Sequence, residues 1–399
     1  MTAPHVAVLG AGILGSSLSI FLARRGARVT LYDKADEPMA AASRWNEGKI
    51  HLGYLYGADP SLRTAAHMLP GGLAFASLVS QLIEAPVRAT TSDDTFLIHR
   101  DSVVDADRAR AQFEAVSRLV REHPDAGRYL VDVSDAHVAD LSPRELAAVA
   151  GDDIIAGYRV PERSVHTRWV ADQLVGAVAA EGRITVRPGS TVVAAAPMDS
   201  TDGPWEVRCA DGGHDAYDVV VNALWSGRLP VDVTARLDPE PPWSHRYRLC
   251  VFARTRSELD IPSALVAVGP FGDVKNYDGR DFYLSWYPSG LVAEGEDLEL
   301  AEPEPLTGPA REGFLAGVRT GLGAHVPGIV RVFDDAEELV VGGGFVFARG
   351  TGSIGDRASS LHTRDRFGVR RRGSYYSVDT GKYSTAPWMA QRLAAEIAS

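Results

Sequence analysis

The sequence predicts an α/β protein that joins a parallel sheet to a second, mostly antiparallel sheet. Three observations favour this fold class. They are a strand, glycine turn, helix and strand at residues 6–33, alternating aromatic-rich strands within 244–290, and a strand followed by a helix near the C-terminus. At 399 residues, the chain is long enough for two intertwined domains with a substantial core.

The first unit contains three regularly spaced glycines after a short apolar strand. Val6–Leu9 is typical of a strand buried on both faces, and it is followed by Gly10, Gly12 and Gly15 in the pattern G-x-G-x-x-G. In such a unit the first glycine permits a tight turn and the second lets the backbone approach a pyrophosphate. The third allows close packing of the helix on the strand.

The rest of this unit favours a dinucleotide as the ligand. The helix after the glycines directs free backbone N–H groups at the phosphates. Asp33 ends the second strand, where an acidic side chain accepts hydrogen bonds from a ribose. Because the glycines stand in the full strand–helix–strand context, the motif predicts dinucleotide binding rather than a turn that only packs.

Periodicity places further elements along the first half of the chain. We expect the helix at 62–83 to be bent or broken near Pro70. Other predicted helices lie at 105–122 and Val165–Ala180, and predicted strands lie at 94–99, 128–133, Ile155–Val160, Ile184–Val186 and Thr191–Ala195.

The pattern changes to long, alternating strands after residue 244. They are predicted at His245–Arg254, Leu265–Val268, Asp273–Tyr277 and Asp281–Tyr287. Such strands form a sheet with one face in a core while the other covers a pocket. The acidic stretch Glu294–Pro309, which contains three prolines, is predicted to be a solvated loop.

Composition excludes several classes of partner. A net charge of −11 and a pI near 5.5 argue against nucleic acid or an anionic membrane as the main partner. Two cysteines do not make a disulfide framework, and no cluster with metal-ligand spacing is apparent. The sequence shows no signal peptide and no stretch of roughly 18 apolar residues, so we expect a cytoplasmic, soluble protein.

Residues 41–57, AASRWNEGKIHLGYLYG, are typical of a loop along a ligand rather than a second strand–helix repeat. Here the chain resembles the flavoprotein oxidoreductases typified by D-amino-acid oxidase and glycine oxidase. The run N-E-G-K-I-H-L-G-Y-L-Y is also similar to the N-x-G-x-I-H-x-G-x-x-Y of relatives that oxidise 2-hydroxyglutarate and glycerol 3-phosphate. This resemblance implies FAD as the cofactor and a Rossmann-like FAD-binding domain with an inserted α+β substrate domain.

Two later segments extend the resemblance. DVVVNALWSGR at 218–228 resembles the family's D-x-V-V-N-A-x-G-x-W turn over the pyrophosphate, but Leu224 and Trp225 stand where the glycine usually falls. Near the C-terminus, Tyr375–Val378 leads into DTGKYSTAPWMAQRL, a glycine turn and a helix with Ser384 or Thr385 as N-cap. In the family, this helix start faces the N1–C2 edge of the flavin.

The resemblance assigns residues to the cofactor and divides the chain. The implied FAD-binding domain comprises 1–85, 150–235 and 335–399, and the implied substrate domain comprises 86–149 and 236–334. The implied FAD-binding residues are Gly10, Gly12, Ile13, Leu14, Gly15, Asp33, Lys34, Ser43, Arg44, Asn46, Gly48, Lys49, Val192, Ala223, Trp225, Gly381, Lys382, Tyr383 and Ser384.

Four residues are candidates for the chemistry. The resemblance places His51 near the reacting carbon, and Lys49 and Lys382 near the flavin, although a structural histidine and solvated lysines remain alternatives. Arg364 is a candidate for binding a carboxylate, as are Arg246 and Arg248, which share one face of a strand. Aromatic candidates for the pocket wall are Tyr54, Tyr56, Tyr283, Trp286 and Tyr287.

The expected reaction is FAD-dependent oxidation of a CH–NH bond in an amino acid or amine, with hydride transfer to flavin N5 and reoxidation by O2. One alternative is oxidation of a CH–OH bond in a 2-hydroxy acid or polyol phosphate, and another is a flavin-binding protein without turnover. A nicotinamide dehydrogenase is a more distant alternative. We expect a small-molecule amine, amino-acid or hydroxy-acid substrate, no nucleic acid or membrane partner, no metal, and a monomer or small homo-oligomer.

Overall fold

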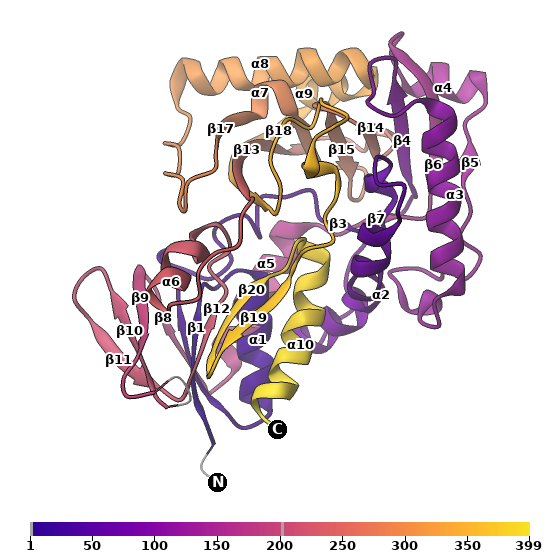
Figure 1. The fold of residues 1–399 in the computed structure, drawn as a ribbon. Coiled ribbons are helices and arrows are strands. Elements are labelled where there is room, and N and C mark those ends of the chain that lie inside the picture. The colour runs from indigo at the N-terminus through magenta and orange to yellow at the C-terminus, as the bar shows by residue number, and fades with distance from the viewer. Residues whose placement is uncertain (1–2, 201–202) are drawn as a thin grey trace.

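The computed structural model describes residues 3–200 and 203–399, and it has two lobes, each built around its own sheet (Figure 1). The N-terminal strand and the C-terminal helix lie together in the lower lobe of the view, although they are separated by most of the chain. The architecture is therefore α/β with a discontinuous first domain, as the sequence predicts.

A six-stranded sheet forms the centre of the lower lobe. Its order is β19 (Gly368–Arg372), β20 (Tyr375–Asp379), β12 (Val219–Asn222), β1 (His5–Leu9), β2 (Arg28–Tyr32) and β8 (Ile184–Arg187). All neighbouring strands are parallel except β19 and β20. Residues 6–9 of the central strand β1 have no exposed surface, in keeping with a strand covered on both faces.

Helices cover one face of this sheet and a small sheet covers the other (Figure 1). The helices are α1 (Ile13–Arg24), α2 (Arg63–Ile83), α5 (Thr167–Ala180) and α10 (Ala386–Ile397). The opposite side carries α6 (Arg228–Thr234) and an antiparallel sheet of β9 (Val192–Pro197), β10 (Trp205–Cys209) and β11 (His214–Tyr217). The two-sided cover explains why the central strands β1 and β12 are almost continuously apolar.

The upper lobe is built on a nine-stranded sheet in which only β14 and β4 run parallel. Its strands are β4 (Asp94–His99), β5 (Ala139–Asp140), β6 (Ile154–Val160), β13 (Ser244–Thr255), β14 (Ala264–Ala267), β15 (Gly272–Asn276), β16 (Asp281–Trp286), β17 (Leu291–Gly295) and β18 (Ala336–Ala348). The helices of this lobe are α3 (Ala106–Glu122), α4 (Pro143–Val149), α7 (Tyr287–Gly290), α8 (Gly308–His325) and α9 (Val330–Asp334).

Strand pairing differs from the sequence-based division of the chain at two elements. β6 and β18 both pair within the nine-stranded sheet, although their residues were assigned to the FAD-binding domain. The glycines of β18 remain extended rather than forming a turn, and they let the loop after β2 pack against this strand. A Cβ on Gly342 would come within 2.2 Å of Trp45, and one on Gly344 within 2.6 Å of Ala42.

Two local expectations are not met. Of the bend or break expected near Pro70, the break is absent, because α2 continues without interruption to Ile83. Instead, Gly71 and Gly72 let the helix approach its neighbours: a Cβ would lie 2.9 Å from Thr385 Cα and 2.2 Å from the His51 carbonyl oxygen, respectively. The strand predicted at 128–133 is a turn after the short helix η2 (Ala126–Arg128), and its Val133 N–H donates to the Ala126 carbonyl.

α2 also corrects the expectation that no stretch matches a membrane-spanning helix. By length and composition, Arg63–Ile83 is long and apolar enough to cross a membrane. Half of its most apolar 18-residue stretch is buried inside the protein. Its apolar residues, including Leu69, Leu73 and Phe75, belong to the main hydrophobic core. These contacts are those of a core helix, which satisfies the same criteria of length and hydropathy.

Candidate active site

The glycine turn after β1 is packed so tightly that side chains are excluded. Gly10 has φ of +97°, and a Cβ there would lie 2.8 Å from the Ala223 carbonyl oxygen. A Cβ on Gly15 would lie 1.8 Å from the Gly10 carbonyl oxygen. The first glycine is therefore required by backbone conformation, and the third by contact between helix and turn.

The first turn of α1 contains no acidic residue of its own, and the turn before it lies beside Asp33. Gly12 is the N-cap of the helix and supplies no side chain. Ile13 N–H donates to Ser43 Oγ at 2.9 Å, while Asp33 accepts from the N–H groups of Ala11 at 2.7 Å and Ala35 at 2.9 Å. The partial positive charge of the helix start thus faces a small, polar neighbourhood suited to phosphate.

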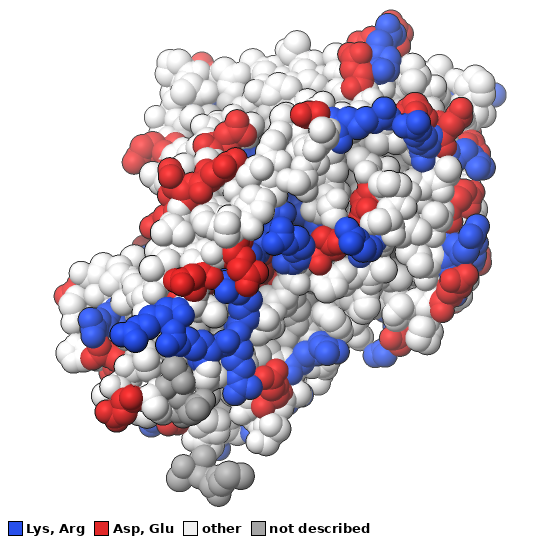
Figure 2. Space-filling view, viewed as in Figure 1, with Lys and Arg blue, Asp and Glu red and all other residues white. Residues whose placement is uncertain are grey.

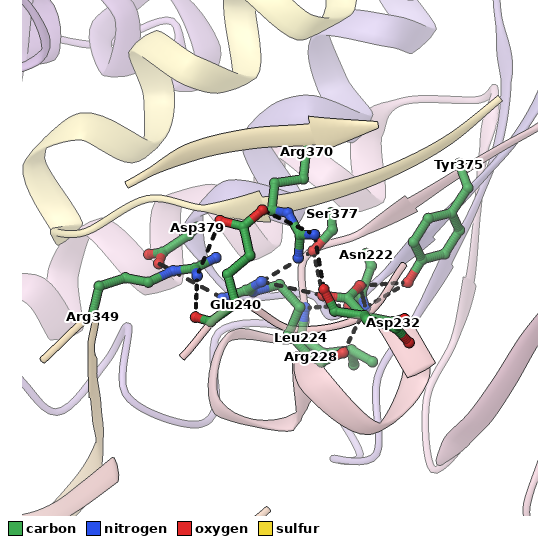
Figure 3. Close-up of polar contacts among 11 residues, drawn as sticks. Asn222, Leu224, Arg228, Asp232, Glu240, Arg349, Arg370, Tyr375, Ser377 and Asp379 are labelled. Atoms are coloured by element: carbon green, nitrogen blue, oxygen red, sulfur yellow. Dashed lines mark hydrogen bonds and ion pairs between the residues drawn. The ribbon is translucent and has the colours of Figure 1, made fainter. Parts of the chain in front are cut away.

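A buried polar cluster fixes the turn after β12 (Figure 3). The same turn packs against Gly10. Asp232 on α6 accepts from Asn222 at 2.9 Å, from Tyr375 at 2.8 Å and from Ser377 at 2.6 Å. Its other partner is Arg228, at 3.2 Å. Because all of these donors converge on one carboxylate, β12, α6 and β20 are held in a single arrangement beside the glycine turn.

Trp225 explains how this chain departs from the family's glycine. It has φ of +55°, the left-handed conformation that glycine adopts most readily, and its indole N–H donates to the Phe345 carbonyl at 2.8 Å. The backbone conformation is therefore the one that favours glycine, while the side chain ties the turn to β18.

The loop between β2 and α2 forms a folded strap between the two lobes. Asn46 donates to the Ala42 carbonyl and accepts from Gly48 N–H, both at 2.9 Å. Gly48 has φ of +69°, and a Cβ there would lie 1.8 Å from the Val165 carbonyl oxygen. After Gly48, the short strand β3 (Lys49–Ile50) pairs with β7 (Arg163–Ser164).

The turn before α10 brings orphaned polar groups to the same region. Gly381 has φ of +65°, and its N–H donates to Asp379 at 2.9 Å. The buried Ser384 Oγ and Tyr383 OH have no hydrogen-bond partner among the described residues. Of the two predicted N-caps, Thr385 occupies the position, although its hydroxyl donates back to the Lys382 carbonyl at 2.8 Å. Unpaired polar atoms at a helix start fit a polar ligand edge.

A cavity of about 200 Å³ lies between the loop, the nine-stranded sheet and the C-terminal turn. Three of the four residues predicted for the chemistry, Lys49, Lys382 and Arg364, line it. Other polar or aromatic residues in its wall are Glu47, Tyr56, Arg246, Arg248, Asp273, Tyr287 and His362. The fourth, His51, is buried, its Nδ1 has no partner among the described residues, and its ring lies 6.2 Å from that of Tyr56.

The cations of the cavity are held mainly by neutral groups. Arg246 donates to Tyr287 OH at 3.2 Å, and Arg364 donates to the Phe347 carbonyl at 2.7 Å. Arg248 donates to Ser285 and lies over the Tyr287 ring, 4.8 Å from its centre. Burial lowers the pKa of Arg364 to about 10 and, with a smaller contribution from neighbouring arginines, that of Lys382 to about 8.

Burial also lowers the pKa of His51 well below its ordinary value, and Lys382 and Lys49 act in the same direction. The His51 imidazole is therefore neutral at pH 7. A neutral imidazole has one nitrogen that accepts a proton, and the unpartnered Nδ1 shows that no described residue uses that atom.

Lys49 belongs to a buried ionic network that crosses between the lobes. Its ammonium lies 2.9 Å from Asp94 and 3.8 Å from Glu162, and Lys275 donates to the same Asp94 at 2.8 Å. Although burial opposes it, Asp94 and Glu162 raise the pKa of Lys49. Glu162 also accepts from Leu52 N–H at 2.6 Å, which fixes the turn that follows His51. Lys49 is thus an ionic tie as well as part of the cavity wall.

Sequence reasoning missed the two carboxylates of the cavity, Glu47 and Asp273. Burial, followed by the charge of Glu47, raises the pKa of Asp273 to about 6. A signal was present: Asp273 and Lys275 alternate with apolar residues inside β15, and charged residues seldom occupy a buried strand without partners.

The remaining predicted residues lie in different settings. Arg44 pairs with Asp172 at 2.8 Å, and exposed Lys34 pairs with Glu302 at 2.7 Å. Val192 is buried under the six-stranded sheet. Of the aromatic residues predicted for the pocket wall, Tyr56 and Tyr287 line the cavity. Tyr54 instead shares a hydrogen bond with the Ser117 hydroxyl, and Trp286 packs on Gly321.

The fold also brings His99, Asp153 and His325 together, with ligand atoms within 4.8 Å of one another, although the sequence showed no metal-ligand spacing. Asp153 already pairs with Arg100 at 3.0 Å. His99 Nδ1 accepts from Asp101 N–H, and His325 Nδ1 lies 2.9 Å from the Gly321 carbonyl oxygen. We assign no metal to this group.

The glycine turn, the acid after β2 and the cavity at the junction of the lobes define a flavoprotein oxidoreductase. The chain belongs to the FAD dependent oxidoreductase family, whose sequence model matches residues 5–395. The cofactor is FAD, and the protein is an FAD-dependent oxidase or dehydrogenase, which confirms the resemblance drawn from the sequence.

Solved structures share this fold at low sequence identity. The chain is similar to glycine oxidase from Geobacillus kaustophilus, with a TM-score of 0.69, 14% identity, and coverage of 99% of this chain and 95% of the other. L-alpha-glycerophosphate oxidase from Mycoplasma pneumoniae, with FAD bound, has a TM-score of 0.65 and 14% identity, and the match covers 100% of this chain and 95% of the other. Iminodiacetate oxidase from Chelativorans sp. BNC1 has a TM-score of 0.66 and 18% identity, and the match covers 98% of this chain and 94% of the other.

Proposed function

We propose that this enzyme oxidises a CH–NH bond of a small, negatively charged amino acid or amine, and that O2 reoxidises the reduced cofactor. The observation that carries the proposal is the wall of the cavity, where Arg246, Arg248, Arg364 and Lys382 converge from separate segments. Guanidinium groups bind carboxylates in a fixed orientation, which is what positioning a substrate carbon requires. Glycine oxidase and iminodiacetate oxidase share the fold.

The residues around the cradle fit FAD. Gly10, Gly12 and Gly15 with the start of α1 would hold the pyrophosphate, and Asp33 would hold the adenosine ribose. Gly381, Tyr383 and Ser384 would meet the flavin end through the orphaned groups at the start of α10. Further residues assigned to the cofactor are Ile13, Leu14, Lys34, Ser43, Arg44, Asn46, Gly48, Lys49, Val192, Ala223, Trp225 and Lys382. When bound, FAD supplies an acceptor for the substrate's hydride at N5.

The protein's own contribution is orientation and proton handling. Arg246 and Arg364 bind the acidic group of the substrate, and Tyr287, which accepts from Arg246, fixes that guanidinium. The ordered cationic wall favours a deprotonated amine, because a positive neighbour makes an ammonium lose its proton more readily. Asp273, whose pKa is raised to about 6, is mainly ionised at pH 7 and is placed in the wall to accept a proton.

A second candidate is oxidation of a CH–OH bond in a 2-hydroxy acid or polyol phosphate. The specific observation in its favour is neutral His51 with its unpartnered Nδ1 beside the cavity. A hydroxyl needs a base to take its proton as the hydride leaves, whereas a free amine does not. L-alpha-glycerophosphate oxidase, which shares the fold, acts on a substrate of this kind by its name.

Anaerobic bleaching of the flavin absorption band tests the proposal. The purified yellow protein is mixed with panels of amines, amino acids, 2-hydroxy acids and polyol phosphates, and ammonia and hydrogen peroxide are measured after air is admitted. Bleaching by amino acids with release of ammonia supports the first candidate, and bleaching by hydroxy compounds alone supports the second. If no compound in any panel bleaches the protein, flavin binding without turnover replaces both.

Binding of a non-reactive carboxylate should weaken as pH rises through the pKa of Lys382. Lys382 is a cation below about pH 8 and neutral above it. Between pH 7 and pH 9 we therefore expect the Kd of a carboxylate inhibitor to rise about tenfold. Titrations followed by the flavin spectrum measure this, with Lys382→Arg as the matched variant, because arginine stays charged over this range. The same rise in both proteins would contradict the assignment.

A further inference from the structure

We infer that the substrate carries two acidic groups, or one doubly charged group such as a phosphate, rather than a single carboxylate. This inference rests on the proposed function, because it takes the cavity to be the substrate site. It narrows the substrate to dicarboxylates and phosphate or phosphonate compounds that also contain the oxidisable CH–NH or CH–OH carbon.

The first observation is that four cations of the cavity have no ion-pair partner. Within residues 3–200 and 203–399, no carboxylate oxygen lies within 4.0 Å of the side-chain nitrogens of Arg246, Arg248, Arg364 or Lys382. The buried arginines elsewhere do have such partners: Arg228 meets Asp232 at 3.2 Å, and Arg349 meets Asp379 at 3.7 Å. Buried charges without partners are costly, so the cavity is set up for an anion.

The nearby carboxylates offset only part of the charge of these cations. Asp94 and Glu162 are already committed to Lys49, and Asp94 also to Lys275. Glu47 and Asp273 are the remaining acids of the wall, and they face five cations in all, since Lys49 also lines the cavity. With the buried network included, there are six cations (these five and Lys275) and four carboxylates (Glu47, Asp273, Asp94 and Glu162). Counting every one as ionised leaves two positive charges in excess, which a single carboxylate does not balance.

The donors are also more numerous than one carboxylate requires. Arg246 and Arg248 come from β13, Arg364 from the segment after β18, and Lys382 from the turn before α10. Buried Arg246 and half-buried Arg248 each retain an Nε–H without a partner among the described residues. One guanidinium is enough to bind one carboxylate through two hydrogen bonds. Four separate cationic groups therefore fit two acidic groups or the three oxygens of a phosphate.

The positive charge of the cavity is opposite in sign to the net charge of the protein. Figure 2 shows lysine, arginine and acidic side chains interspersed over the face in view, in a protein with a net charge of −11. The positive charge of the cavity is therefore a local feature of the site, and a doubly charged ligand gains most of its attraction after it enters.

Equilibrium binding to the FAD-loaded enzyme tests the inference without turnover. The probes are malonate and inorganic phosphate as double anions and acetate as a single anion, titrated at constant ionic strength and followed by the flavin spectrum. We expect malonate or phosphate to bind at least about tenfold more tightly than acetate. Malonate preferred over phosphate indicates a dicarboxylate, and the reverse order indicates a phosphate compound.

Variants separate this inference from a change in folding. Arg364→Gln should reduce the preference for double over single anions about tenfold, and Arg364→Lys should restore part of it. Arg108→Gln on α3, where the side chain is mostly exposed, is the matched control and should leave the preference unchanged. If Arg364→Gln does not hold flavin, the affinities of the unaltered enzyme for malonate, phosphate and acetate still decide whether the site prefers a doubly charged anion.

Two outcomes distinguish the inference from the proposed function. Equal affinity for malonate and acetate, together with bleaching by an amino acid that has one carboxylate, overturns the inference and leaves the proposed function intact. A strong preference for double anions without bleaching by any compound overturns the proposed function and leaves a doubly charged anion as the ligand of the cavity.

Discussion

Gly12→Val is expected to yield a folded protein that is purified almost without flavin. The Cβ at this position would already lie 3.0 Å from Ser43 Oγ, and the two methyl groups of valine extend beyond it. They would fill the space in front of the first N–H groups of α1, where we propose that the pyrophosphate binds. The ratio of flavin to protein absorbance should fall by about tenfold or more.

A matched control is available on α5. A Cβ added to Gly176 would have no atom within 4 Å, so Gly176→Ala tests a glycine whose absence of side chain is not required by contacts. This variant should keep its flavin and gain up to about 1 kcal/mol of stability, because alanine favours helix. Gly12→Val with a normal flavin content would remove the main support for the cofactor assignment.

Asp94→Asn is expected to cause the largest loss of stability, about 3–5 kcal/mol, because it leaves two buried ammonium groups without their shared anion. Asp94 has no exposed surface, and its carboxylate lies 2.9 Å from Lys49 and 2.8 Å from Lys275. The free energy of unfolding in urea, followed by circular dichroism on protein with equal flavin content, measures the effect.

An exposed ion pair provides the contrast. Asp334→Asn breaks a surface pair with Arg319 and should change the free energy of unfolding by less than about 1 kcal/mol. Similar losses in the two variants would show that the buried network does not contribute as the geometry indicates. The comparison also requires that both proteins unfold in a single transition.

The pH dependence of the Asp94 effect has a definite sign. Burial would raise the pKa of Asp94, but Lys275 and Lys49 hold it below its ordinary value. A carboxyl with a depressed folded pKa stabilises the protein above its unfolded pKa of about 4, and this contribution is lost as pH falls further. The difference between the unaltered protein and Asp94→Asn should therefore shrink below about pH 4.

Local patterns were sufficient for the cofactor-binding unit and for most strands. Backbone conformation depends here on residues that are near in sequence. This holds for the spacing of Gly10, Gly12 and Gly15 and for the alternation within 244–290. At two places the local pattern and the structure differ. α2 continues through Pro70, with Gly71 and Gly72 packed against distant segments, and 128–133 has no adjacent strand in the described sheets with which to pair.

The sequence by itself determined that this protein binds a dinucleotide and that parallel and antiparallel sheets are combined, and its resemblance to a flavoprotein family indicated FAD. These features can be predicted because glycine turns, capped helices and alternating strands depend on residues that are close together in the sequence. Only the tertiary structure decided which charges meet: Lys49 with Asp94, and Arg246 with Arg364 around one cavity. Such contacts join residues far apart in the chain, and burial, which sets their pKa values and the cost of leaving them unpaired, exists only after the lobes have packed.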